Sequence, residues 1–463
     1  MKPWRWIGLT ALALVPYLGA LHAPLLYDDR TLLDNRWLAR EAGPVSVFRH
    51  HFFYGSRREA SDLYRPLTAL SLAWNLRATP SKEGIRAVNL ALHALATLAL
   101  AWMLAEIATR TGSPPRGVPW IGAAIFAVHP LGSEAVLWAV GRADVAAAAL
   151  GAVAFVLYLR ERLLPAAAAF LAALCFKESA AAWLAIGAAW TLLVPPRPPV
   201  RAALARAAAF GGAFAAYLLL RGSAVGWAAE PRPFVDNPLA SADAATRVAN
   251  AILLLVRYAG KMIWPRTLSV EYGFDQIPVV PLVPWGALAA LAIAAAAVAS
   301  VVALLRRGRR REAFLVAFVP CAFAVTGNVI APIGTIFAER LAYLPLMGFC
   351  ALAGLALASI PAPAWRGAAL AAILVAGGSR TIARGRDYRD LAALSEATAA
   401  ASPRAVKALY NAARTRMRLG RTPDAIPLLE RAVAIWPEYT RARELLEQAR
   451  RGSDGGSIET EAP

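Results

Sequence analysis

Residues 284–305 read PWGALAALAIAAAAVASVVALL, an apolar run without a charged side chain. A helix needs about 20 such residues to cross the hydrocarbon core of a bilayer. Several other runs of the chain are comparably apolar, and they are continuous, whereas the strands of a membrane barrel alternate between polar and apolar residues. The sequence therefore predicts an all-α fold, a polytopic membrane helical bundle.

Composition supports a membrane protein and argues against a nucleic-acid partner. The chain of 463 residues is 58% hydrophobic and only 17% charged, whereas soluble domains carry about a quarter charged residues. The net charge of +19 comes from Arg groups between apolar runs, which is typical of loops retained on the cytoplasmic side. The three cysteines lie inside apolar runs without metal-ligand spacing, and we interpret them as buried hydrophobes.

The placement of basic residues predicts about 11 spans. Lys2 and Arg5 place the N-terminus inside, so the first outer loop is expected at 27–85. A second outer loop is expected at 221–283, and its stretch 247–264 reads as an interfacial helix. The expected spans lie at about 6–26 (uncleaved), 86–107, 118–137, 143–159, 207–220, 284–305, 312–328, 341–360 and 365–379, with a two-helix hairpin or one long helix in 163–194.

An odd number of spans places the C-terminus outside, although Arg380, Arg384, Arg386 and Arg389 follow the last span and oppose this orientation. The multi-span domain is expected to cover 1–381. The abundance of Arg and Ala is typical of a GC-rich bacterial genome. The expected location is therefore a bacterial inner membrane, with the outer loops and the C-terminus in the periplasm.

Residues 382–451 are predicted to form a small tetratricopeptide-type helical domain. Val406–Tyr439 fits one unit of about 34 residues, with Gly420 at its turn and Pro437 ending its second helix. A generic helical hairpin is the alternative. Flanking helices would cap a single repeat, and such surfaces often bind a protein partner. Residues 452–463 are expected to be disordered.

Charged residues gather at the outer ends of the expected spans, where ionisable groups are costly and often functional. A carboxylate there can act as a general base, and Arg is well suited to bind phosphate. The alternatives are a polar helix stop, a solvated loop charge or a structural ion-pair network; no ligand spacing supports a metal site. The groups are Asp28 with Asp29, Arg65, His129 with Glu134, Arg142 with Asp144, Lys177 with Glu178, and Glu339 with Arg340.

Six short blocks carry a family resemblance, and we expect them to meet at one outer site. They are Tyr27–Asp29, Tyr64–Leu67, Phe126–Val136, Gly141–Asp144, Lys177–Ser179 and Ala338–Pro345. In this order, and with a C-terminal repeat, the chain resembles the transmembrane and tetratricopeptide-repeat-containing protein O-mannosyltransferases over about residues 1–440. The resemblance implies the C-type glycosyltransferase fold.

It also implies transfer of mannose from a polyprenyl-phosphate donor in the membrane to Ser or Thr hydroxyls on the outer side, without cofactor or metal. The catalytic carboxylate would be Asp28 or Asp29. The short repeat region leaves the acceptor open between a protein, a glycan and a lipid. Donor binding would fall on Arg65, His129, Arg142, Lys177 and Arg340, with Glu134, Asp144 and Glu339 as orienting partners and Glu178 within the same site.

Two other functions remain as alternatives. A non-catalytic membrane anchor that presents the repeat for complex assembly would tolerate replacement of Asp28 or Arg142. A transporter is disfavoured, because the sequence has no evident inverted repeat.

Overall fold

The computed structural model describes residues 3–56, 61–112, 117–228, 230–281 and 284–453. Helices and their connections make up these segments, and none of them contains a β-strand. The all-α prediction is confirmed for this part of the chain. Of the tail predicted to be disordered, 454–463 lies outside the described residues, whereas 452–453 end the last helix.

The first half of the chain packs around one central helix. Its α8 is buried on nearly every side, because its Ala-rich surface contacts the neighbouring helices α5 and α9. A helix that is apolar all round belongs inside a bundle. The helices of this half are α1 (Pro3–Leu14), η1 (Val15–Ala20), α2 (Asp28–Leu33), α3 (Arg36–Arg40), η2 (Ser46–Phe48), α4 (Pro66–Ala78), α5 (Lys82–Arg110), α6 (Val118–Val128), η3 (Pro130–Gly132), α7 (Ser133–Leu137), α8 (Arg142–Leu159), α9 (Leu163–Phe176), η4 (Glu178–Ala181) and α10 (Ala182–Leu193).

The helices of the second half first pack on this bundle, and the last four, at the C-terminus, project from it. Helix α15 crosses α6 closely, since a Cβ on Gly354 would meet the backbone nitrogen of Gly122 at 2.9 Å. Small residues at such crossings are typical of membrane helices. The helices are α11 (Val200–Val225), η5 (Pro238–Ser241), α12 (Ala244–Ile263), α13 (Pro284–Arg306), α14 (Arg310–Ala322), η6 (Glu339–Ala342), α15 (Tyr343–Ala358), α16 (Pro363–Asp387), α17 (Leu391–Ala401), α18 (Val406–Arg418), α19 (Thr422–Ile435) and α20 (Thr440–Ser453).

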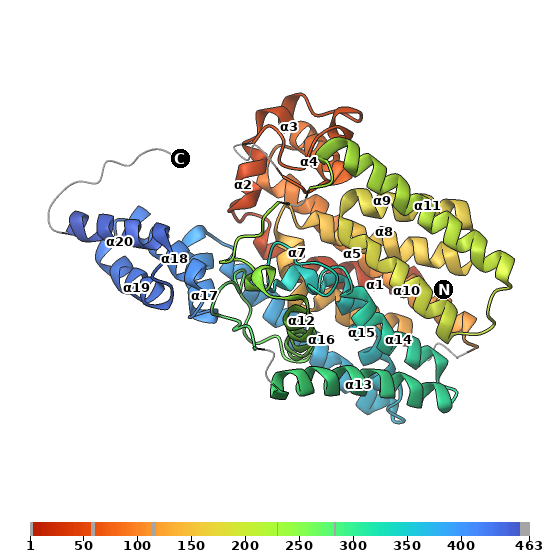
Figure 1. Ribbon diagram of the computed structural model, residues 1–463. Helices are drawn as coiled ribbons and strands as arrows, with labels where there is room; N and C mark the ends of the chain where they lie inside the picture. Colours follow the sequence, from red (N-terminus) through yellow and green to blue (C-terminus); the bar gives the residue numbers. More distant parts are fainter. Residues whose placement is uncertain (1–2, 57–60, 113–116, 229, 282–283, 454–463) are drawn as a thin grey trace.

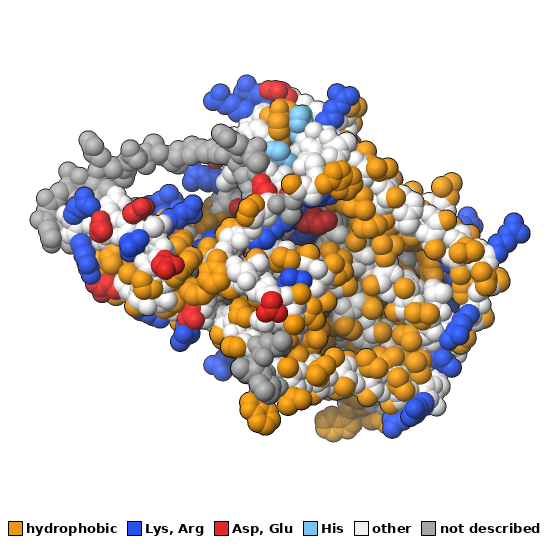
Figure 2. All heavy atoms as spheres, in the orientation of Figure 1, with side chains coloured by type: hydrophobic (Ala, Val, Ile, Leu, Met, Phe, Trp, Pro, Cys, Tyr) orange, Lys and Arg blue, Asp and Glu red, His pale blue; other side chains and the backbone are white. Residues whose placement is uncertain are grey.

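Several helices are suited to a membrane, but fewer than the sequence predicts. Within the described residues, 5 helices are long and apolar enough to cross a membrane. The number is 6 if α6 and Pro130–Leu137, which are bent by 55° relative to one another, form one span. In α11 and α13 only 6% of the apolar window is buried, and Figure 2 shows a hydrophobic surface there with basic side chains at its edge. The structure thus supports a multi-pass membrane protein, and 11 spans stay a prediction.

Individual segments explain the difference. The stretch 163–194 forms two helices, α9 and α10, as the hairpin interpretation expects, but each is shorter than a usual span. The first expected span is an α-helix only to Leu14 and continues as a 3₁₀ helix to Ala20. The expected interfacial stretch 247–264 lies in α12, which buries one face, including Leu254 and Tyr258.

The C-terminal helices α17 to α20 form a small array that projects from the bundle (Figure 1). Gly420 has a φ of +74° and makes the turn between α18 and α19, as predicted, because a left-handed residue suits a helix end. Helix α19 ends at Ile435, just before Pro437. The array has its own core, which includes Leu409, Ala425 and Leu429; its classification as a tetratricopeptide repeat stays a prediction.

Candidate active site

The two adjacent carboxylates at the start of α2 have different environments. Asp29 is 2% exposed, and its oxygens accept backbone hydrogen bonds from Ala139 (2.8 Å) and Val140 (3.0 Å). Asp28 is exposed, and no hydrogen bond or ion pair joins its carboxylate to any residue that the structure describes. Asp29 therefore anchors α2, while Asp28 keeps a free carboxylate.

Tyr27 sets this orientation. Its φ of +48° is uncommon for a bulky residue and marks local strain of a kind that clusters at functional sites. Its ring stacks on Trp138, with 5.9 Å between the centroids, and its hydroxyl is 3.2 Å from Ser395 Oγ of α17. The residue before the acidic pair is thus held by both the bundle and the C-terminal helices.

Burial changes the acidity of Asp29. It raises the pKa of this carboxyl from 3.8 to about 6, although the amide hydrogen bonds and the nearby Arg86 oppose the change. A buried carboxylate pays a desolvation penalty that hydrogen bonds only partly offset. The ionised form of Asp29 is therefore costly to the folded state.

Arg340 is a cation whose guanidinium is partly exposed and could therefore contact a donor phosphate. Its backbone nitrogen donates to Glu134 Oε2 at 2.9 Å, and its Nη1 donates to Glu134 Oε1. The Glu134 side chain is buried, whereas that of Arg340 is 34% exposed. The charge of Asp28 acts on Arg340, so the free carboxylate and this guanidinium share one region.

Two further ion pairs join blocks that are far apart in sequence. Arg65 binds Glu178 through two hydrogen bonds of 3.0 and 2.6 Å. Lys177 Nζ lies 2.6 and 2.7 Å from the two oxygens of Asp144. The adjacent Lys177 and Glu178 thus bind different partners.

His129 and Arg142 connect helices through their polar atoms. His129 Nε2 donates to the carbonyl oxygen of Met262 at 2.9 Å, and its Nδ1 accepts from Leu131. Arg142 is fully buried and donates to the side-chain oxygens of Asn89 (3.0 Å) and Asn75 (2.9 Å). Contact of either residue with a donor phosphate stays a prediction, and it would compete with these bonds.

Glu339 is fully buried and lies next to Arg340 in the chain. Its Oε1 accepts from the Ser269 amide at 2.6 Å and from the Tyr272 hydroxyl at 2.5 Å. Its Oε2 is 3.9 Å from Nη2 of Arg384, which is also fully buried. From the sequence, Arg384 reads as a flank of the last span. Helix α16 instead continues through it to Asp387, which accepts from Arg384 at 2.9 Å.

The sequence analysis missed a second charged cluster beside Asp28. Lys407 Nζ of α18 lies 2.6 Å from Asp236 Oδ1 and 3.6 Å from Glu271 Oε2. Burial and Asp236 raise the pKa of Glu271, while Lys407 and Arg340 oppose this change. Burial lowers the pKa of Lys407, but Glu271, Asp236 and Asp28 outweigh it and raise the pKa.

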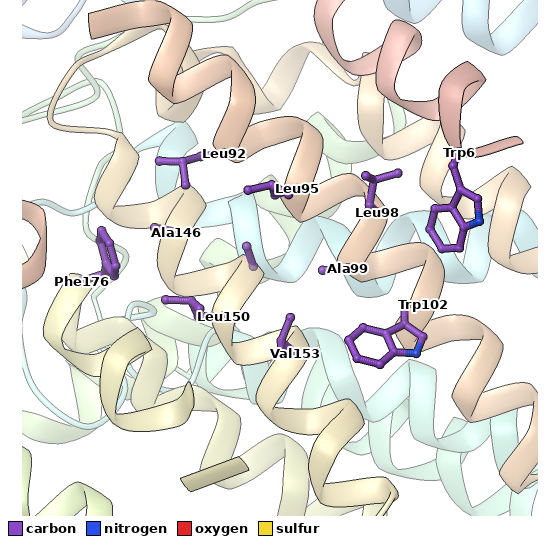
Figure 3. A pocket seen from close by; sticks show the side chains of 11 residues that line it. Trp6, Leu92, Leu95, Leu98, Ala99, Trp102, Ala146, Leu150, Val153 and Phe176 are labelled. Carbon is purple, nitrogen blue, oxygen red and sulfur yellow. The ribbon is translucent and has the colours of Figure 1, made fainter. Parts of the chain in front are cut away.

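The described residues contain no group of three or more His, Cys, Asp or Glu side chains that could hold a metal ion. They do contain an apolar groove of about 650 Å³ between α1, α5 and α8. Figure 3 shows Phe176 and Leu92 at one end of the groove and Trp6 and Trp102 at the other. Phe176, at one end of the groove, directly precedes Lys177 in the chain.

Comparisons with known proteins give relatives of one kind, although no family model matches the chain. Protein O-mannosyl-transferase Tmtc1 of Drosophila melanogaster is 30% identical over 299 residues, which cover 58% of this chain and 34% of the relative. Protein O-mannosyl-transferase F38B6.6 of Caenorhabditis elegans is 23% identical over 443 residues, or 93% and 62%. Human protein O-mannosyl-transferase TMTC4 is 25% identical over 407 residues, or 75% and 54%.

The chain therefore spans between about a third and three fifths of the length of these relatives. The matches cover three quarters or more of this chain in two of the three cases. The homologues of this chain are thus TMTC-family protein O-mannosyl-transferases, at low identity.

Proposed function

We propose that this chain is a membrane glycosyltransferase that moves a sugar, mannose by analogy with its homologues, from a polyprenyl-phosphate donor to a hydroxyl group of an acceptor protein. The observation that carries the proposal is the free carboxylate of Asp28 beside the partly exposed guanidinium of Arg340. The names of the homologues support transfer of mannose to proteins.

Asp28 serves as the general base in this proposal. The acceptor oxygen forms a bond to the anomeric carbon, the bond from that carbon to the phosphate oxygen breaks, and the electron pair stays on the phosphate. The acceptor proton passes to the Asp28 carboxylate. One carboxylate suffices, because base and leaving group act on opposite faces of the sugar in an inverting displacement. Asp29 positions Asp28 by anchoring α2.

Cations near the reacting bond stabilise the phosphate that leaves. Preorganised charges are effective because they need no rearrangement during the reaction. Arg340 is held by Glu134 and keeps an exposed portion. Lys177 and Arg65 lie within electrostatic reach of it through the cluster they form with Asp144 and Glu178.

The apolar groove supports a lipid-linked donor. Its lining includes no charged side chain, so an isoprenoid chain can leave the surrounding lipid for the groove without exposing apolar surface to water, and packing contacts would hold it there. Because Phe176 at its end is followed by Lys177, a chain in the groove would bring its phosphate towards the cations.

We propose that the site faces the outer side of the membrane, within a C-type fold of about 11 spans. In Figure 1, the α10–α11 and α13–α14 connections lie with the N-terminus at one end of the bundle, and α2, α7 and the C-terminal helices lie towards the other. The first end carries the basic residues Arg197, Arg201 and Arg306–Arg311, and such loops stay in the cytoplasm. The proposed location is a bacterial inner membrane, with the active site on the periplasmic side. The C-terminal helices are proposed to be a tetratricopeptide-type array that binds a protein.

Sugar transfer by the purified full chain tests this function. The donor is a radiolabelled polyprenyl-phosphate mannose, and the acceptors are Ser- and Thr-containing peptides. We expect Asp28→Asn to lower the rate by about 10²–10⁴-fold, the usual contribution of a general base. Asp34→Asn is the matched control, because Asp34 is an exposed carboxylate next to the same helix. Equal rates for wild type and Asp28→Asn would remove the proposed base and favour a non-catalytic scaffold.

A further inference from the structure

The C-terminal array is docked firmly onto the outer loops of the bundle. Phe274 packs on Trp436 with 5.2 Å between the ring centroids, and Phe274 and Val235 pack against the core of the array. Ser402 Oγ donates to Ser269 Oγ at 2.8 Å. The rings of Phe274 and Trp436 are both partly buried, and aromatic packing of this kind contributes more than exposed polar contacts do.

A charged side chain of the array enters the candidate active site through this interface. Lys407 lies one residue after the start of α18, and its Nζ contacts both Asp236 (2.6 Å) and Glu271 (3.6 Å) of the outer loops. Asp28 also acts on Lys407, and Arg340 acts on Glu271. Lys407 therefore belongs to the same set of charges as the proposed base.

Without Lys407 this region would have an excess of negative charge. Asp236 and Glu271 are close enough to repel one another, and Arg340 already pairs with Glu134. Asp236 and Glu271 would then lack a cation partner, although the Gly273 amide still donates to Glu271 Oε1 at 3.1 Å, and like charges at short range cost free energy in a partly buried region. The outer loop could relieve this repulsion only by moving away or by binding a proton.

From these contacts we propose that Lys407 is a positioning residue of the active site, so that the C-terminal array completes a composite reaction centre. Lys407 binds both Asp236 and Glu271. It thereby neutralises part of the negative charge near Asp28 and Arg340. Its catalytic consequence rests on the proposed glycosyltransferase function, whereas its hold on the loop does not. The array then has a role inside the enzyme besides any binding of a partner.

Three variants of the full chain test this role. Lys407→Met removes the charge and keeps the length of the side chain, and Lys407→Arg keeps the charge. Arg404→Met is the matched control, because Arg404 pairs with Asp275 (2.5 Å) across the same interface with a side chain that is 69% exposed. Hydrogen–deuterium exchange of residues 234–237 and 269–274, together with the pH dependence of sugar transfer, provides the two measurements.

We expect Lys407→Met to raise exchange in both segments and to lower kcat by at least tenfold, with recovery in Lys407→Arg and no change in Arg404→Met. The groups that face Glu271 are Lys407, Asp236, Arg340 and Tyr27. Since Lys407 opposes the raised pKa of Glu271, its removal should move the acidic limb of the transfer profile to higher pH.

Wild-type exchange in Lys407→Met would overturn the inference. Equal losses in Lys407→Met and Arg404→Met would also overturn it, because both would then act only through docking. If wild type transfers no sugar, the proposed function fails, and the exchange measurement alone decides whether Lys407 holds the loop.

Discussion

Replacing Asp29 by Asn tests whether this residue is an anchor that the fold keeps at an energetic cost. The carboxylate accepts two backbone hydrogen bonds while it is almost completely buried. An Asn side chain has one acceptor oxygen, so one of the two amides would lose its partner. The same substitution removes a charge that burial disfavours.

The cost of the buried charge depends on pH. Burial raises the pKa of Asp29 from 3.8 to about 6 in the folded chain, which corresponds to about 3 kcal/mol at about 1.4 kcal/mol per pH unit. The unfolded chain releases this proton first as the pH rises, so the free energy of unfolding falls between about pH 4 and pH 6 and then stays level. The lost amide partner does not distinguish the two proteins at pH 4, because the protonated carboxyl of Asp29 also has a single carbonyl acceptor; above pH 6 the two amide bonds to the carboxylate are already included in the raised pKa.

The assay is thermal unfolding of wild type and Asp29→Asn in detergent from pH 4 to pH 7.5. We expect the two proteins to have similar stability at pH 4 and Asp29→Asn to be the more stable above pH 6, by up to about 3 kcal/mol. Asp34→Asn, a change of an exposed carboxylate, should follow the wild-type curve. Parallel curves for wild type and Asp29→Asn across the whole range would refute the buried, costly anchor.

Two more predictions concern the donor. Arg340→Lys should lower kcat/KM for sugar transfer by about 10- to 100-fold, because Lys keeps the backbone contact with Glu134 but its ammonium group cannot reproduce both the guanidinium contact with Glu134 and the planar fork that binds a phosphate; an unchanged value would contradict its role. Leu95→Trp, at a half-exposed position of the apolar groove, should raise KM for the lipid-linked donor, whereas Leu192→Trp in a separate groove should not; equal KM values would place the lipid chain elsewhere.

Much of the site could be predicted from sequence because charged residues in an apolar chain are informative. The blocks around Arg65, Glu134, Asp144, Lys177 and Arg340 do meet, in three ion pairs. A charged side chain is energetically costly at membrane depth, so each one needs a partner of opposite charge or a hydrogen bond. This requirement can be predicted from the positions of charged residues in an apolar sequence. The outcome therefore followed from the positions of the charges along the chain.

The partners within those pairs could not be predicted in the same way. Lys177 and Glu178 are adjacent, and only the break between α9 and η4 turns them towards different helices. The different environments of Asp28 and Asp29 follow a residue with positive φ, Tyr27. No sequence pattern predicts this backbone conformation. Lys407 was missed because its partners belong to loops more than a hundred residues away.

The distribution of partners supports Asp28 as the proposed base. A carboxylate that is fixed by cations or amides has little free capacity to accept a proton from a substrate, since those bonds favour its ionised form. Within the described residues, amides bind Asp29, cations pair with Glu134, Asp144 and Glu178, and Ser269 with Tyr272 binds Glu339. Among the carboxylates predicted from the sequence, Asp28 alone has none of these partners in the described chain. Among these predicted carboxylates the network thus leaves Asp28 available for the proposed chemistry, next to Tyr27, which contacts both the bundle and the C-terminal array.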